Sequence, residues 1–222
     1  MTVILVLFTF AVFLLVDYLL HPEAAVQPAV ERQSELAPQL QPRFIEGFYT
    51  PEKLRYHAGH SWLLEERRHL ARVGIDEFAA KLAGAIDKIE LPKPGQWIRQ
   101  GQRAWSLFRG DERSEMVSPT EGEVIEVNPD VVEHPELLRQ DPYGRGWLMT
   151  VHVPDDDSTS RNLIPRRLVP NWMRDAVQSL YAQQPQLAGA VAAEGGRPVD
   201  DIAAALPAVS WKQLTSEHFL PK

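Results

Sequence analysis

Hydrophobic residues form one nearly uninterrupted run at the start of the chain. Residues 3–16 are uncharged and almost wholly apolar, and the run resumes at residues 18–20 after Asp17. A helix over this run spans roughly 27 Å, close to the thickness of a bilayer's hydrocarbon core. A cleaved signal peptide is the competing interpretation, but the run lacks a basic leader and a small-x-small cleavage site. We therefore expect residues 1–20 to be a single-pass transmembrane anchor in the cell membrane.

The side of the membrane on which the rest of the chain lies stays open. The first 31 residues contain no Lys or Arg, so the positive-inside rule has almost nothing to count. Residues 21–43 are polar and rich in proline, which predicts a stiff stalk.

Short apolar runs separated by Gly and Pro then extend over residues 44–153, the pattern of an all-β unit. Two short helices are expected to interrupt this unit. One covers residues 76–82, where Asp76 is a suitable N-cap, and the other covers residues 133–139. The prediction is a mainly β domain.

Residues 154–222 have a different character. They begin with an acidic, Ser/Thr-rich stretch, residues 155–160, which is expected to be a solvated linker. Three helices are then predicted, over residues 171–182 behind Asn171, residues 199–206 behind Pro198, and residues 211–219 behind a capping box of Ser210 and Gln213. This segment is therefore a helical C-terminal extension that packs on the β unit or on a partner.

An internal duplication organises the β unit. Residues 92–95 and 119–122 both have the form P-x-x-G, and apolar residues follow each at the same offset. Two such small units cannot each bury a core, so we expect them to face one another in a sandwich. The residues predicted to meet across it are Trp97, Ile98, Val124 and Ile125.

Composition narrows the classes of function. The 222 residues carry a formal net charge of −7, which argues against a nucleic-acid partner because such proteins need a basic surface. The chain contains no Cys, which excludes disulfides, thiol nucleophiles and Cys-based metal sites.

Five stretches carry a family resemblance. They are His60 with Trp62, Val-Gly-Ile-Asp at 73–76, Ile-Glu-Leu-Pro-x-x-Gly at 89–95, the stretch 118–128 with Ser118, Pro119 and Gly122, and Asp-Pro-Tyr-Gly-Arg-Gly-Trp-Leu at 141–148. In this order and spacing they resemble the signatures of the glycine cleavage system H-protein, over about residues 49–153. The resemblance implies the lipoyl-type barrel-sandwich hybrid, a mainly β fold with short helices.

The resemblance fails where this family carries its lipoyl group. The family presents a modified lysine on an exposed hairpin, seven residues before the Ser of a Ser-Pro pair, and that position here is Asp111, with Phe108 in place of the family's Glu. The six lysines (Lys53, Lys81, Lys88, Lys93, Lys212 and Lys222) all lie off the hairpin. Lipoate is attached through an amide to an amine, so Asp111 is not modifiable and no cofactor is expected. The candidates for partner contact at the tip are Arg109, Gly110, Glu112 and Arg113.

Two further groups of residues suggest weaker hypotheses, a metal site and a partner interface. His57 and His60, with His69 nearby, could be metal ligands, but zinc needs three converging ligands, so no metal is predicted. Trp172 and Trp211, near helix starts in the extension, are candidates for a partner interface.

The leading interpretation is a membrane-anchored, non-lipoylated accessory or docking subunit, not an enzyme, that binds a protein partner. The alternative is a working carrier that shuttles an aminomethyl or sulfur-bound intermediate on lipoate attached at an unconventional site. A third interpretation is a regulator that competes with a true H-protein for its ligase or decarboxylase.

Overall fold

The computed structural model describes residues 43–183, 198–205 and 210–221. The predicted anchor and all of the predicted stalk except Arg43 lie outside these residues. Among the described residues, no helix is both long and apolar enough to cross a bilayer.

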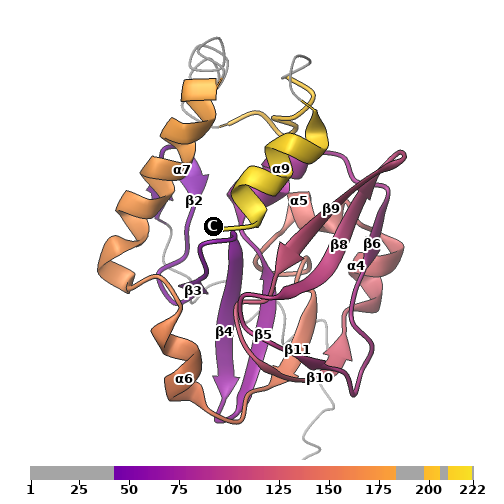
Figure 1. Ribbon diagram of the computed structural model, residues 1–222, viewed down its shortest axis with the longest axis vertical. Coiled ribbons are helices and arrows are strands. Elements are labelled where there is room, and N and C mark those ends of the chain that lie inside the picture. Colours follow the sequence, from indigo (N-terminus) through magenta and orange to yellow (C-terminus); the bar gives the residue numbers. More distant parts are fainter. Residues whose placement is uncertain (1–42, 184–197, 206–209, 222) are drawn as a thin grey trace, which may run out of the picture. The chain divides into compact units, whose positions relative to one another are not determined.

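The described strands form three antiparallel sheets, which confirms a mainly β domain (Figure 1). The largest has the order β3-β4-β5-β11-β10-β7, the second is β6-β8-β9, and β1 pairs with β2. The strands are β1 (Phe44–Ile45), β2 (Phe48–Tyr49), β3 (Arg55–Tyr56), β4 (Ser61–Arg67), β5 (Leu70–Ile75), β6 (Lys88–Glu90), β7 (Trp97–Ile98), β8 (Arg103–Arg109), β9 (Glu112–Val117), β10 (Gly122–Val127) and β11 (Met149–His152).

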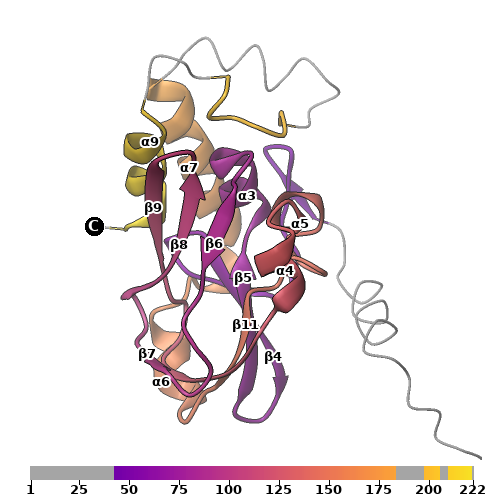
Figure 2. The same cartoon turned by 90° about the vertical axis from the view of Figure 1, so that its right-hand side faces the viewer.

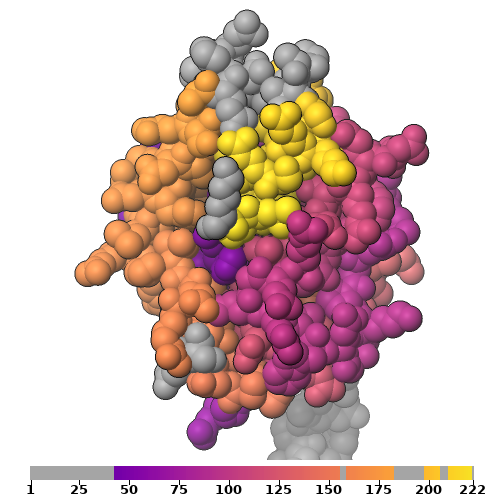
Figure 3. Space-filling model, viewed as in Figure 1, coloured from indigo at the N-terminus to yellow at the C-terminus, as the bar shows by residue number. Residues whose placement is uncertain are grey.

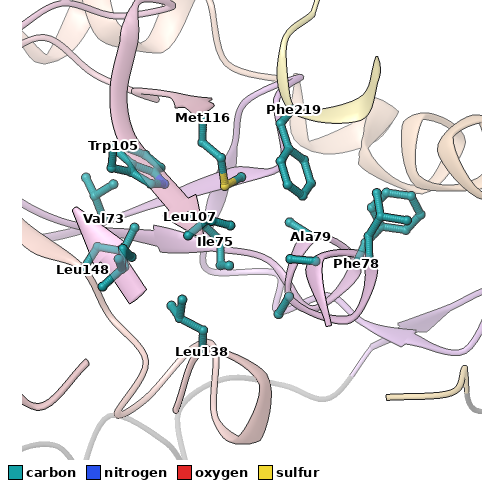
Figure 4. Close-up of a cluster of buried hydrophobic side chains, with 14 of the residues drawn as sticks. Val73, Ile75, Phe78, Ala79, Trp105, Leu107, Met116, Leu138, Leu148 and Phe219 are labelled. Carbon is teal, nitrogen blue, oxygen red and sulfur yellow. The ribbon is translucent and has the colours of Figure 1, made fainter. Parts of the chain in front are cut away.

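The core lies where apolar side chains of the two larger sheets meet (Figure 4). Val73 and Ile75 of β5 contribute from the six-stranded sheet, and Leu107 and Met116 contribute from the three-stranded one. All four side chains are fully buried. Helices close the core, and Phe219, near the end of the chain, belongs to it as well.

The first predicted helix is confirmed. Helix α3 (Glu77–Ala83) begins after Asp76, whose Oδ1 accepts a hydrogen bond from the Ala79 N–H at 2.8 Å. The second prediction was wrong, because residues 133–139 are not one helix. The chain forms α4 (Pro129–Glu133) and α5 (Leu137–Gln140) instead. Pro135 lies between them, and proline both lacks an N–H donor and disfavours helix in the residue before it.

The predicted linker at residues 155–160 was also wrong. These residues contribute most of helix α6 (Asp156–Arg161), and the Thr159 side chain is buried against Thr120, with 3.1 Å between the two hydroxyl oxygens. A 3-10 turn, η2 (Arg166–Leu168), then leads into α7 (Val169–Gln183). This helix begins before Asn171, because Pro170 is well suited to a first turn.

The end of the chain follows the prediction only in part. Residues 199–205 of the predicted helix 199–206 are described, and they contain a turn at residues 202–205 instead of a helix. Helix α9 (Trp211–Phe219) has the predicted bounds with Ser210 as N-cap, but the side chain of Ser210 makes no capping bond. Its hydroxyl donates instead to Glu112 Oε1, at 3.2 Å.

The two P-x-x-G units do not face one another. The strands that follow them, β7 and β10, are neighbours in one sheet, with Ile98 paired to Gly122 and Trp97 to Glu123. The strands that precede them, β6 and β9, both belong to the three-stranded sheet. Ile98 and Val124 are buried as predicted, whereas Trp97 and Ile125 are 51% and 48% exposed. The error follows from the period of a strand, in which neighbouring side chains alternate between faces.

Candidate functional site

The hairpin of β8 and β9 is intact to its tip. The paired register ends at Arg109 and Glu112, which leaves Gly110 and Asp111 as a two-residue turn. Gly110 has φ +55°, which glycine adopts without steric cost, and its N–H donates to Asp87 Oδ2 at 2.6 Å. Asp111 is exposed. The structure therefore places Asp111, the residue singled out from the sequence, at the exposed end of a hydrogen-bonded hairpin.

An aromatic ring between two cations lies on the outer face of this hairpin. Phe108 is the register partner of Lys88 on β6 and of Arg113 on β9. The Lys88 ammonium lies 5.1 Å from the centre of the Phe108 ring and the Arg113 guanidinium 5.9 Å, both within cation–π range. Arg113 also donates to Ser106 Oγ at 3.0 Å, yet 54% of its side chain is exposed. This face holds its charged groups in place and leaves them open to solvent.

The other two tip candidates are engaged inside the chain. Arg109 Nη1 donates to Asp201 Oδ1 at 3.1 Å and to the Ala83 carbonyl at 3.3 Å. Glu112 Oε1 accepts the Ser210 hydroxyl and the backbone N–H of Lys212, at 3.2 and 3.4 Å. Residues after 197 thus contact the side chains on either side of the tip, a contact that sequence reasoning missed.

His60 is the centre of a buried aromatic stack. Its Nδ1 lies 2.8 Å from Asp76 Oδ2, and its ring lies between Phe78 and Trp172, with centroid distances of 4.3 and 4.6 Å. The backbone of His60 has φ +59°. The side chain is 2% exposed, so this signature residue fixes the start of β4 against α3 and α7.

Two further histidines lie close to His60 and favour the neutral form. Burial first, and then nearby His60, lowers the pKa of His57, whose Nδ1 accepts the Gly59 N–H at 3.1 Å. The same two causes lower the pKa of His218 to about 4. His218 Nε2 is buried and has no hydrogen-bond partner among the described residues. Nothing in the sequence pattern pointed to His218.

The histidines do not form a metal site. Across the part of the chain that the structure describes, no three His, Cys, Asp or Glu side chains converge in a geometry that could hold an ion. His69, the third residue of the hypothesis, is directed to the Val153 carbonyl, 3.1 Å from Nδ1.

The remaining signature positions are structural. Trp62 is fully buried and donates to the Ile75 carbonyl at 2.8 Å; a Cβ on Gly74 would lie 2.4 Å from its ring. Ser118 is buried and donates to the Thr120 carbonyl at 2.6 Å, next to buried Pro119. Gly122, at φ +151°, passes so close to β11 that a Cβ would lie 2.1 Å from the His152 oxygen.

Both tryptophans proposed for a partner interface pack inside the chain. Trp172 stacks on His60, and Trp211 is buried, with its Nε1 donating to the Ala83 carbonyl at 2.9 Å.

The tip does not fit a lipoyl group. Gly110 and Asp111 offer no amine, so the amide through which lipoate is attached cannot form there. Two lysines, Lys88 on β6 and Lys81 on α3, form ion pairs with glutamates of their own elements. Lys88 Nζ is 2.7 Å from Glu90 Oε1, and the Lys81 ammonium is buried, 3.2 Å from both Glu77 Oε1 and the Pro198 carbonyl.

Comparison with known proteins identifies relatives of the β domain. The sequence model described as glycine cleavage H-protein matches residues 54–174, more than half of the chain. The glycine cleavage system H protein of Carboxydothermus hydrogenoformans is 34% identical over 115 residues, covering 52% of this chain and 88% of that protein. The H protein of Thermobifida fusca is 38% identical over 106 residues, covering 48% and 83%. A crystal structure of a glycine cleavage system H protein from Mycobacterium marinum covers 50% of this chain and 97% of its own, with 25% identity and a TM-score of 0.44.

Proposed function

Because the chain belongs to the glycine cleavage H-protein family, we propose that it is an H-protein-like docking subunit that is not lipoylated. H-proteins are carriers, not enzymes, so the proposed role is recognition of a protein partner without catalysis. Residues 54–174 supply the scaffold, and the apolar residues 1–20 anchor it in the cell membrane.

One observation carries this proposal. The hairpin keeps its register, its tip turn and its exposure, but the residue at its end is a carboxylate. A carboxylate cannot accept lipoate, whereas the charged outer face beside it remains available to a partner. A domain recruited only for binding needs the hairpin surface but not the lysine that carries lipoate.

The mass of the full-length protein tests the absence of lipoate. We expect the unmodified mass even when cells contain abundant lipoate and active ligases. Lipoate on any of the six lysines would make the chain a carrier and overturn the proposal.

Capture of the partner tests the docking role. The full-length protein is cross-linked in detergent-solubilised membranes, purified, and its attached proteins are identified. We expect one protein at near-stoichiometric yield, and its loss in the double variant Asp111→Ala/Arg113→Ala. The matched control is Arg174→Ala, an exposed arginine on α7 whose guanidinium bonds the nearby Asn171 side chain at 3.0 Å. Equal loss in this control would show that the hairpin does not carry recognition.

Membrane attachment has its own test. The full-length chain should remain in the membrane pellet through a high-pH wash, and deletion of residues 1–20 should release it. Full-length protein that washes off, or that is found cleaved near residue 25, would contradict the anchor.

A further inference from the structure

Part of the inner face of the hairpin is covered by the end of the same chain, and the rest of it faces the six-stranded sheet. Glu112, Ser114 and Met116 alternate along β9 and therefore share a face. Helix α9 packs along this strand (Figures 1 and 2), and its surface is continuous with that of the hairpin (Figure 3). The first residues of α9 bond Glu112, and Phe219 near its end lies close to Met116 (Figure 4). We name the described residues 198–205 and 210–221 the C-terminal strap.

Asp201 is the polar anchor of this strap. Its carboxylate accepts from Arg109 Nη1 on the hairpin at 3.1 Å, from the Ala85 N–H after α3 at 3.2 Å, and from the Ala204 N–H at 2.9 Å. The fit is close, because a Cβ on Gly84 would lie 2.1 Å from Asp201 Oδ1. One side chain therefore joins the strap to α3 and to the hairpin.

The strap can separate from the rest of the fold without breaking a sheet. None of its described residues belongs to a strand. Beyond Asp201, its polar contacts run to two places. The Ile202 N–H and Trp211 Nε1 donate to the Lys81 and Ala83 carbonyls, both at 2.9 Å, and Lys81 Nζ donates to the Pro198 carbonyl. Ser210 and the Lys212 N–H bond Glu112.

Proteins open in units smaller than the whole fold, and a terminal segment outside the sheets is suited to such a unit. Four of the strap's side chains, Ile202, Trp211, Leu214 and Phe219, are buried in the core, so we expect opening to be infrequent. The strap also lies beyond residue 174, where the family match ends.

We propose that the inner face of the hairpin is an interaction surface that the C-terminal strap occupies in cis, and that the strap opens as a unit to expose it. In the closed state a partner reaches only the tip and the outer face, at Asp111, Phe108 and Arg113. A partner that takes the inner face must replace what the strap provides. Such a partner must offer hydrogen-bond donors to Glu112, a carboxylate to Arg109 and apolar side chains to Met116. A short amphipathic helix that follows an acidic residue has all three.

This inference rests on the proposed docking role for its purpose, but its test does not use a partner. The chain has no Cys, so a single engineered thiol is a unique probe. Ser114 is 3% exposed and its Oγ has no hydrogen-bond partner among the described residues, so Ser114→Cys loses no bond. In the full-length protein, we expect this thiol to react with an aromatic disulfide reagent only as fast as the strap opens. Adding Asp201→Ala should raise that rate at least about tenfold.

Two controls make the measurement decisive. Asp200→Ala changes the neighbouring carboxylate, which is 79% exposed and lies 3.6 Å from Lys81, and should alter the rate by less than about twofold. Val151→Cys reports opening of the six-stranded sheet, and Asp201→Ala should leave its rate unchanged. The proposal fails if Asp201→Ala has no effect or accelerates both thiols equally, or if Ser114→Cys reacts as fast as a free thiol. Such a failure would contradict strap opening but not the proposed docking role. Failure of the partner-capture experiment would contradict the docking role but not strap opening.

Discussion

The two faces of the β8–β9 hairpin come from alternate residues of the same strands but have opposite surroundings. On the inner face, Met116 is fully buried and Glu112 bonds the start of α9. On the outer face, Arg113 is half exposed and contacts Ser106, Glu115 and Phe108, its neighbours in the sheet. Burial concentrates folding free energy on the inner face, because apolar area removed from water stabilises in proportion to its size. The outer face can therefore change for recognition at little cost in stability.

Among substitutions that compare the two faces, Trp211→Ala is expected to cause the largest loss of stability. The side chain is buried against the end of α3 and donates one hydrogen bond there. Its removal should lower the free energy of unfolding by about 3–5 kcal/mol, measured by urea denaturation of the full-length chain in detergent with far-UV circular dichroism. Trp97→Ala, at a half-exposed tryptophan, should cost below about 1 kcal/mol. A loss below about 1 kcal/mol in Trp211→Ala, no larger than that in Trp97→Ala, would mean that the strap does not stabilise the fold.

The second largest effect on stability is expected from a fall in pH, through His218 on α9, the helix that covers the inner face. The pKa of His218 is about 4 in the folded chain, against an ordinary value of 6.5, so the unfolded chain binds more protons between these values. Stability is therefore lost as the pH falls from about 6.5 towards 4, by roughly 2 kcal/mol at pH 5. The lowered pKa of His57 acts in the same direction.

A substitution separates this effect from general acid denaturation. His218→Phe should flatten the loss of stability between pH 7 and pH 5 in the same denaturation experiment. His134→Phe, at a histidine whose side chain is 61% exposed, should keep the full slope. An unchanged slope in His218→Phe would show that another group causes the loss.

Glu112→Ala is expected to have a smaller effect on the covered side. The carboxylate takes the place of a helix N-cap for α9, an interaction typically worth about 0.5–2 kcal/mol. The loss should appear as faster hydrogen exchange in residues 211–219. Glu112→Gln, which keeps a carbonyl acceptor, should restore most of the protection. Failure of this rescue would indicate that the charge and not the hydrogen bond holds the helix.

Arg113→Ala should have the smallest effect on stability. Its contacts lie on the open face, so we expect a change below about 0.5 kcal/mol in the free energy of unfolding. The same variant should lower the yield of the cross-linked partner. A large loss of stability with unchanged capture would reverse the roles that we assign to the two faces.

Local signals determined the parts of the fold that depend on neighbouring residues. The capping bond of Asp76 spans three residues, and the turn at Gly110 and Asp111 needs only its two strands, so both were predictable from sequence. The order of the signature stretches also indicated the family, because they mark the turns and packed positions of the scaffold. That Asp111 stands where the family carries its lipoylated lysine stays a prediction from the sequence.

Only the tertiary structure decided which surfaces are free. Ser210 has the sequence of an N-cap, yet its hydroxyl bonds Glu112, which is 98 residues away in the chain. Asp201 is one of two adjacent aspartates, and the fold alone places it against Gly84 and Arg109 while Asp200 stays largely exposed. The hairpin and its exposed tip follow from local hydrogen bonding and turn preference, which the sequence by itself determines. The covering of the inner face follows from long-range packing, where many partners compete for the same apolar and charged groups, so only the folded chain shows which contact is made.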